Sequence, residues 1–216
     1  MHEDCIYKGI CENECENLCT QYAEMSYLLK TSNLPKSQWC VHKMYPDECD
    51  LPAFERLAEI QENIYDFVKQ GKNIYLYSKQ LGNGKTTWMV KLLLQYFNEV
   101  WYGNGFKERG IIINVPTYLI RCKHAISRPD EELNDIHERI LNCDLAILDD
   151  VTVTNLSNYD YTNLLAYVDS RLFSGKSTFY TGNYAPNELE KIVGGRLASR
   201  ISSSEVIELK GIDNRR

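Results

Sequence analysis

Short apolar segments alternate with amphipathic ones from about residue 53 onward, and this alternation constrains the fold more than any other feature. An apolar segment of five or six residues suits a strand that is buried on both faces. Strands separated by helices pair in parallel, with the helices covering both faces of the sheet. The pattern therefore predicts a three-layer α/β domain with a five-stranded parallel sheet. The expected strands are residues 73–78, 111–115, 145–149, 177–182 and 205–210.

The segments between these strands predict helices. Before the first strand, apolar side chains recur at helical spacing and Gly71 follows them as a stop signal. Pro116 suits the first turn of a later helix because it needs no backbone donor there. The expected helices are residues 53–70, 85–101, 116–126, 131–142, 158–173 and 187–201.

A glycine-rich turn, SKQLGNGKTT at residues 78–87, joins the first strand to its helix. A phosphate-binding loop has Gly, four free residues, then Gly-Lys-Ser/Thr. Here Lys79 stands at the first glycine position. Lys85 would contact the β- and γ-phosphates and the Thr86 hydroxyl would bind Mg²⁺. On this motif alone, a surface turn before a helix explains the residues equally well. The expected nucleotide-binding residues are Gly82, Asn83, Gly84, Lys85, Thr86 and Thr87.

A second motif, LAILDD at residues 145–150, is a buried strand that ends in two acids. Ligands bind at the carboxyl edge of such a sheet. Asp149 would hold Mg²⁺ and Asp150 would polarise the attacking water. In isolation, the acids suit a helix cap or a solvated turn. Two motifs on strands that fit one sheet predict an ATP site.

Two later features concern the fate of the nucleotide. Asn183 follows the strand at 177–182, where it would position the attacking water or form a turn. Arg196 and Arg200 lie four residues apart on one helical face. They would reach the γ-phosphate of a neighbouring subunit as arginine fingers, or form a surface ion-pair face.

Together these motifs resemble the AAA+ ATPases of the replicative-helicase loader group (the DnaC/DnaI type, related to the IstB type). The resemblance rests on GNGKTT, LAILDD, YTGN, GRLASRI and GIDNRR, and covers residues 53–216. It implies that Asn183 is sensor 1, Arg200 the arginine finger and Arg215 the sensor 2 that contacts the nucleotide. It also implies an ATPase with Mg²⁺ as cofactor. Lys79 and Asp150, which replaces the commoner glutamate, predict slow turnover.

The function that the resemblance implies is ATP-dependent loading of a hexameric replicative helicase onto single-stranded DNA during replication. The AAA+ domains would associate side by side around the DNA. The alternatives are an IstB-like transposition ATPase, a nucleotide-binding adaptor with little hydrolysis, and a small-molecule kinase, for which no lid segment is evident. Basic residues could contact DNA or form a solvated face. They are Lys107, Arg109, Arg121, Lys123 and His124.

Residues 1–50 differ in character, because five of the eight cysteines fall within the first 40 residues. We expect a small, mainly helical domain held by Zn²⁺ or an iron–sulfur cluster, or one that packs reduced cysteines as apolar side chains. By resemblance, this domain would bind the helicase. The candidate ligands are Cys5, Cys11, Cys15 and Cys19, and Cys40 or His42 could replace one of them.

The composition excludes some classes of protein. The net charge of −6 argues against a generally basic nucleic-acid coat and suits a protein partner. No run of 18 apolar residues and no secretory signal is present in the sequence. We therefore expect a cytoplasmic bacterial protein with reduced cysteines, and its small size is compatible with a phage origin.

Overall fold

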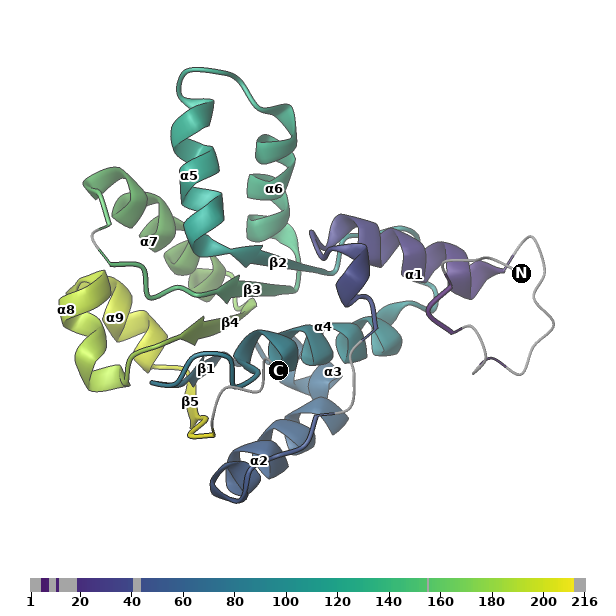
Figure 1. Cartoon of the computed structure of the whole chain (residues 1–216). Helices are drawn as coiled ribbons and strands as arrows, with labels where there is room; N and C mark the ends of the chain where they lie inside the picture. The colour runs from purple at the N-terminus through teal and green to yellow at the C-terminus, as the bar shows by residue number, and fades with distance from the viewer. Residues whose placement is uncertain (1–4, 8–10, 12–18, 41–43, 155, 212–216) are drawn as a thin grey trace.

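A single parallel sheet forms the centre of the computed structural model, which describes residues 5–7, 11, 19–40, 44–154 and 156–211. The strand order is β2-β3-β4-β1-β5 (Figure 1). This confirms the predicted five-stranded parallel sheet. The strands are β1 (Ile74–Tyr77), β2 (Gly110–Asn114), β3 (Leu145–Asp149), β4 (Ser177–Gly182) and β5 (Glu205–Glu208).

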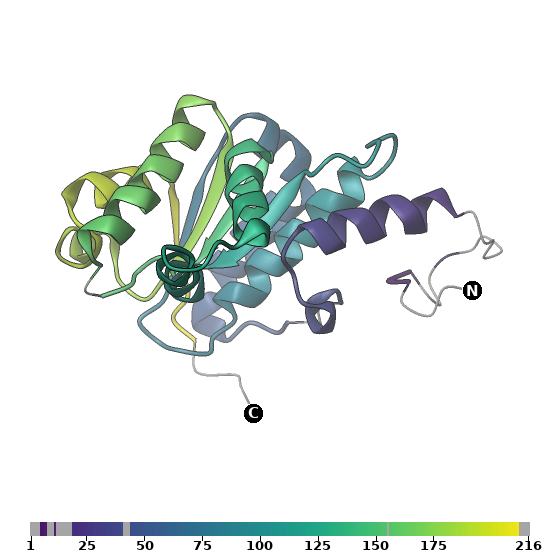
Figure 2. The ribbon, with the colours of Figure 1, turned by 90° about the horizontal axis from the view of Figure 1, so that it is seen from above.

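Helices cover both faces of the sheet, as Figure 2 shows from above. Side chains alternate along β1, so that Ile74 and Leu76 join one apolar layer while Tyr75 and Tyr77 join the other. The first layer is covered by α1 (Thr20–Thr31), α2 (Leu51–Glu62), α3 (Ile64–Lys69) and α4 (Lys85–Val100). The second is covered by α5 (Val115–Ala125), α6 (Glu131–Asn142), α7 (Asn158–Phe173), α8 (Leu189–Val193) and α9 (Gly195–Ser202).

Two of the expected helices were predicted wrongly as continuous. The helix expected at 53–70 is interrupted at Asn63, whose backbone leaves the helical region (φ −112°, ψ 23°) between α2 and α3. The helix expected at 187–201 is interrupted at Gly194 (φ 81°, ψ 151°), which separates α8 from α9. Single turns of 3₁₀ helix add η1 (Lys36–Gln38), η2 (Glu48–Asp50) and η3 (Pro186–Glu188). Among the described residues, no helix is long and apolar enough to cross a membrane.

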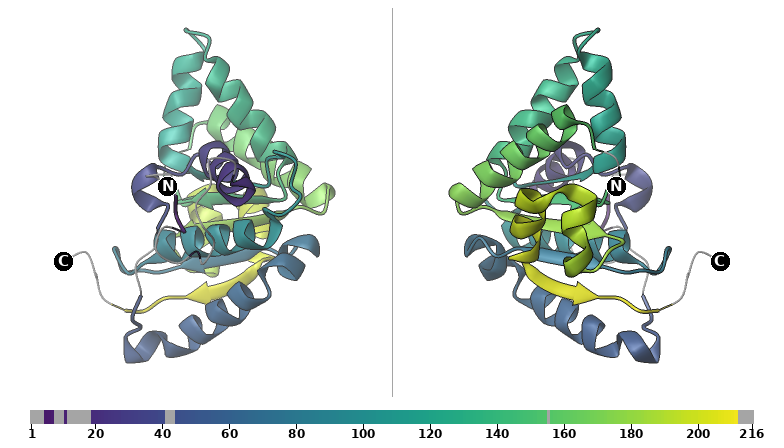
Figure 3. Two further views of the ribbon diagram at one scale, coloured as in Figure 1. Left: turned by 90° about the vertical axis from the view of Figure 1, so that its right-hand side faces the viewer. Right: turned by 90° about the vertical axis from the view of Figure 1, so that its left-hand side faces the viewer.

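The described residues 19–40 pack on the same core as the sheet. Leu28, Leu29 and Trp39 are buried in the apolar layer that also contains the α4 side chains. The chain after α1 also pairs with the open edge of β2, since the Ile112 amide donates to the Ser32 carbonyl at 2.9 Å. Figure 2 shows α1 beside α4 at one end of the domain, and Figure 3 shows α2 next to β5. The proposed boundary near residue 50 stays a prediction.

Candidate nucleotide-binding site

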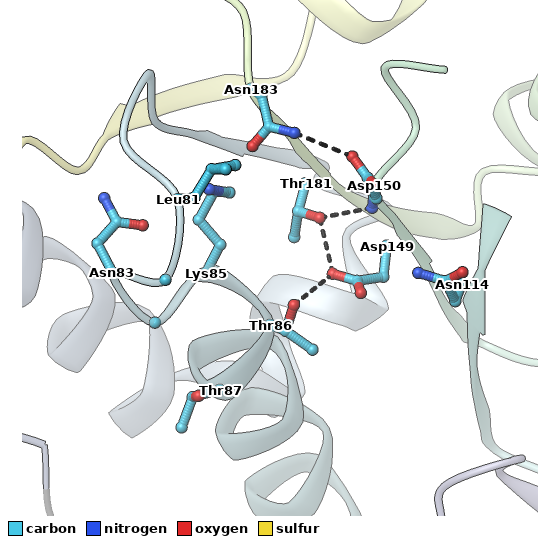
Figure 4. Close-up of a pocket in the computed structure, with 12 residues that line it drawn as sticks. Leu81, Asn83, Lys85, Thr86, Thr87, Asn114, Asp149, Asp150, Thr181 and Asn183 are labelled. Atoms are coloured by element: carbon cyan, nitrogen blue, oxygen red, sulfur yellow. Dashed lines mark hydrogen bonds between the residues drawn. The ribbon is translucent and has the colours of Figure 1, made fainter. Parts of the chain in front are cut away.

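A cavity of about 310 Å³ lies at the carboxyl edge of the sheet, in front of the glycine-rich turn (Figure 4). Because β4 lies between β1 and β3, the loop after β1 and the acids after β3 face each other across the end of β4. The cavity brings together the loop and acidic residues singled out from the sequence. Its lining is Leu81, Gly82, Asn83, Gly84, Lys85, Thr86, Thr87, Asn114, Asp149, Asp150, Thr181 and Asn183.

The turn before α4 has the geometry of a phosphate-binding loop. Gly82 and Gly84 have φ angles of +75° and +94°, in the left-handed region that favours glycine. A Cβ at Gly84 would lie 2.6 Å from the Met44 side chain. Lys85 begins α4, so the positive end of the 16-residue helix faces the cavity. The loop and the helix N-terminus therefore fit a phosphate group.

Lys79, the departure from the motif, points away from the cavity. Its ammonium forms an ion pair with Glu188 at 3.2 Å, and both side chains are exposed. Lys79 has a negative φ, in contrast to Asn33, Phe106 and Asp150, whose φ angles are positive although they are not glycines. The backbone at position 79 therefore does not require glycine, and its side chain does not enter the cavity.

Asn83 ties the phosphate-binding loop to the end of β5. Its side chain is buried, and its amide donates to the Ser78 hydroxyl and to the Leu209 carbonyl, the latter at 3.4 Å. Its Oδ1 has no hydrogen-bond partner among the described residues. Asn83 therefore holds the loop from behind while lining the cavity.

The Thr86 hydroxyl and the Asp149 carboxylate, the expected Mg²⁺ ligands, are already in contact. Thr86 Oγ1 donates to Asp149 Oδ1 at 2.9 Å, and Thr181 Oγ1 donates to the same oxygen at 2.7 Å. Asp149 is only 8% exposed. A hydroxyl and a carboxylate at this spacing are oxygen ligands of the kind that Mg²⁺ prefers, so the residues fit the ion.

Asp150 has an unusual backbone and a shifted acidity. Its φ is +57°, a left-handed conformation that aspartate adopts more readily than most residues. Its amide donates to Thr181 Oγ1 at 2.7 Å, and Asn183 Nδ2 donates to its Oδ1 at 3.2 Å. Burial raises the pKa of the Asp150 carboxyl, the neighbouring Asp149 raises it further, and Lys85 opposes both. A raised pKa makes the Asp150 carboxylate a stronger base than an ordinary aspartate.

Sequence reasoning missed three residues in the lining: Leu81, which lies within the glycine-rich turn, and the polar residues Asn114 and Thr181. Asn114 ends β2 directly opposite Asp149, and its side chain also caps α5 by accepting from the Thr117 amide. Thr181 lies near the end of β4 and bridges the two acids. The available signal was positional, since polar residues at the carboxyl ends of neighbouring parallel strands meet at one edge.

The proposed arginine finger lies outside this cavity. Arg200 lies on α9 and donates to Asp169 Oδ1 at 2.7 Å, and Arg196 is 3.9 Å from the same carboxylate. Both contacts are within one chain. The role of Arg200 across a subunit boundary stays a prediction, and Arg215, the proposed sensor 2, lies outside the described residues.

The cysteine ligands are only partly described. Cys5 and Cys11 are free thiols, and Cys19 caps α1 by accepting from the Tyr22 amide at 3.4 Å. Cys15 and His42 lie outside the described residues. Within the part of the chain that is described, no group of three or more His, Cys, Asp or Glu could hold a metal ion. Cys40, the proposed substitute ligand, is an exposed thiol.

Three of the basic residues considered for DNA contact are held in ion pairs within the chain. Arg121 pairs with Asp130 at 2.6 Å, Lys123 with Asp160 at 2.7 Å, and Arg109 with Asp144 at 2.7 Å. The remaining two candidates are Lys107 and His124, both exposed.

Comparison with known proteins identifies the fold. No protein-family model and no curated protein matches the sequence. Solved structures do match. The DnaC helicase loader aligns with a TM-score of 0.67 at 20% identity, over 82% of this chain and all of that chain. The chain has the AAA+ P-loop fold.

Two further solved structures share this fold. DnaI aligns with a TM-score of 0.64 at 19% identity, over 85% of this chain and 95% of that chain. The replication initiator DnaA bound to AMPPCP and single-stranded DNA aligns with a TM-score of 0.58 at 19% identity, over 80% of this chain and half of that chain. The AAA+ fold is shared by nucleotide-binding proteins, and the cavity lies at the edge of the sheet where ligands bind in such folds.

Proposed function

We propose that this protein is an AAA+ ATPase that loads a hexameric replicative helicase onto single-stranded DNA. The main support for ATPase activity is the arrangement of residues in the cavity. It unites a glycine loop at a helix N-terminus, a threonine–aspartate pair suited to Mg²⁺, and a second aspartate beside an asparagine. An adaptor that only binds nucleotide would need the first two features but not the third.

The phosphates of ATP would bind at the glycine loop. The backbone N–H groups of the loop and the start of α4 donate to phosphate oxygens, and Lys85 neutralises charge on the β- and γ-phosphates. At present the Lys85 ammonium donates to the Gln80 carbonyl at 3.3 Å, so it must leave that contact to reach the nucleotide. Thr86 and Asp149 would hold Mg²⁺, which lowers the negative charge on the phosphates.

Hydrolysis would use the side chains at the ends of β3 and β4. Asn183 and Asp150 orient a water molecule, and its oxygen forms a bond to the γ-phosphorus. The bond from that phosphorus to the β–γ bridging oxygen breaks, the electron pair stays with ADP, and the Asp150 carboxylate takes the proton of the water. Arg200 of a neighbouring copy would stabilise the charge, which requires it to leave its contact with Asp169.

Helicase loading rests on likeness rather than on the cavity. The neighbours in fold include the DnaC helicase loader, and a related AAA+ neighbour, DnaA, is bound to single-stranded DNA. We propose the same partners for this chain, with residues 1–50 as the helicase-binding part and side-by-side association of the AAA+ domains. The four cysteines, Cys5, Cys11, Cys15 and Cys19, would hold Zn²⁺ or an iron–sulfur cluster there.

The test is ATP hydrolysis by the purified chain, with and without single-stranded DNA and a replicative helicase. Lys85→Ala should abolish nucleotide binding, and Arg200→Ala should abolish hydrolysis while keeping binding. A mixture of the two variants should recover part of the activity, because each Lys85→Ala copy still supplies an intact Arg200 to its neighbour. Binding without hydrolysis in the wild type would make the protein an adaptor. Absence of binding would refute the nucleotide site altogether.

A further inference from the structure

The end of β4 carries a buried hydroxyl between the two acids of the cavity. Thr181 is 1% exposed, and Figure 4 shows its Oγ1 in contact with both Asp149 and the backbone of Asp150. Neither the glycine-loop pattern nor the acidic strand pattern includes a residue at this position.

We infer that Thr181 is a positioning residue for nucleotide hydrolysis, setting the Asp149 carboxylate and the Asp150 backbone at once through a single hydroxyl. This inference rests on the proposed ATPase function. It deepens that function by adding a residue that acts through the acids rather than on the nucleotide.

The chemistry of the two contacts requires a hydroxyl. The hydroxyl donates its proton to Asp149 Oδ1 at 2.7 Å, and a lone pair on the same oxygen accepts the Asp150 amide at 2.7 Å. Only a group with one donor and free acceptor capacity satisfies both partners at one atom. A methyl group of the same size would satisfy neither.

The contact with the Asp150 amide is made at a residue whose backbone has an uncommon left-handed conformation. Asp150 has φ +57°, and a residue held in this region persists only when its surroundings determine the conformation. The next residue is held by the same strand, since the Val151 amide donates to the Thr181 carbonyl at 2.9 Å. Thr181 therefore fixes the chain on both sides of the Asp150 carbonyl.

The Asp150 side chain depends on the same strand end. Asn183, two residues after Thr181, donates to Asp150 Oδ1 at 3.2 Å, and its own amide donates to the Thr152 hydroxyl at 3.0 Å. The backbone and the carboxylate of Asp150 are thus both held by hydrogen bonds to residues at the end of β4. Loss of the Thr181 hydroxyl releases the backbone and lets the carboxylate drift from the water that it orients.

The experiment compares Thr181→Val, which keeps the shape and removes the hydroxyl, with Thr181→Ser, which keeps the hydroxyl. Thr162→Val is the matched control, because Thr162 is an exposed threonine on α7 outside the cavity. The readouts are kcat, KM for ATP, and the Mg²⁺ concentration needed for half-maximal binding of a non-hydrolysable ATP analogue. The thermal midpoint of each variant shows that it is folded.

Thr181→Val should lower kcat about 10- to 100-fold with KM changed less than about 3-fold, since misplaced catalytic groups cost rates of this order. It should also raise the Mg²⁺ requirement for binding, because Asp149 loses a donor that orients it. Thr181→Ser and Thr162→Val should stay within about 3-fold of the wild type.

A valine variant as fast as the wild type, with an unchanged Mg²⁺ requirement, would overturn the inference and leave the ATPase proposal intact. So would a serine variant as slow as the valine variant, because the methyl group rather than the hydroxyl would then matter. If the wild type binds nucleotide without hydrolysing it, the ATPase proposal fails. The Mg²⁺ titration then still decides whether Thr181 positions Asp149.

Discussion

A buried carboxylate joins the N-terminal part of the chain to the last strand, and its removal should be costly. Asp50 ends η2, directly before α2, and is 3% exposed. Its Oδ1 accepts from the Lys210 amide at 2.6 Å, and its Oδ2 accepts from the Gly211 amide at 3.0 Å. Lys210 and Gly211 follow β5 after one intervening residue, and a Cβ at Gly211 would lie 2.5 Å from the Asp50 carboxylate. The turn that contains Asp50 and the chain after β5 are therefore in direct contact.

The magnitude follows from the two contacts. A hydrogen bond to a charged group contributes about 1.5–3 kcal/mol, and a buried donor left unsatisfied costs a similar amount. Asp50→Ala removes one acceptor group that serves two backbone amides, one buried and one partly buried, so the free energy of unfolding should fall by about 3–5 kcal/mol. In a chain of this size, this corresponds to a loss of roughly 10 °C in the thermal midpoint. Asp50→Asn retains one carbonyl oxygen and should lose about half as much.

The assay is urea unfolding followed by circular dichroism, with thermal unfolding as a second measurement. Glu48→Ala is the control, because Glu48 is an exposed acid in the same turn and should change the free energy of unfolding by less than about 0.5 kcal/mol. A loss below about 1 kcal/mol for Asp50→Ala would refute the reasoning. It would mean that water or a rearranged chain satisfies the two amides.

Four further predictions concern the cavity and its support. Lys79→Ala should leave ATP binding within about 2-fold of wild type in a fluorescence titration, since surface ion pairs contribute little. Gly84→Ala should weaken the same binding at least about 10-fold, because the backbone of Gly84 has a left-handed φ of +94° that disfavours any side chain. The hydrolysis rate should rise with pH through the raised pKa of Asp150, whose deprotonated form is the base, and Asp150→Asn should remove that limb of the pH profile. Arg171→Met should lower the free energy of unfolding by about 3 kcal/mol in urea, because the buried guanidinium satisfies several carbonyl groups.

Where the sequence predicted the fold well, local and tertiary preferences agree. Strands β1 and β3 are buried along their whole length because both faces of the sheet are covered there, so each stands out in the sequence as an apolar run. Helix α7 begins as predicted because Ser157 and Asp160 form a capping box at its start. At Asn63 and Gly194 the prediction failed, because a single backbone conformation interrupts an apolar pattern that continues past it.

The residues of the candidate site also fall into two groups, those that the sequence predicted and those that it did not. The glycine loop and the acids are each encoded in a short stretch, so local patterns were enough to single them out. Thr181 and Asn114 were missed because their importance depends on which strands are neighbours. The order β2-β3-β4-β1 places the ends of β2 and β4 on either side of Asp149, and no local pattern specifies that order.

The loop pattern combines two separate physical requirements for glycine, and Lys79 shows that neither of them applies at the first position of the pattern. Glycine is required where φ is positive or where a side chain would collide with a fixed neighbour, and Gly84 meets the first condition with a φ of +94°. Lys79 meets neither, since its φ is negative and its side chain extends to Glu188 outside the cavity. The departure from the pattern is therefore no reason to expect a defective nucleotide site. If turnover is slow, the cause should be sought at Asp150, where a short carboxylate with a raised pKa is held in a left-handed backbone by its neighbours on β4.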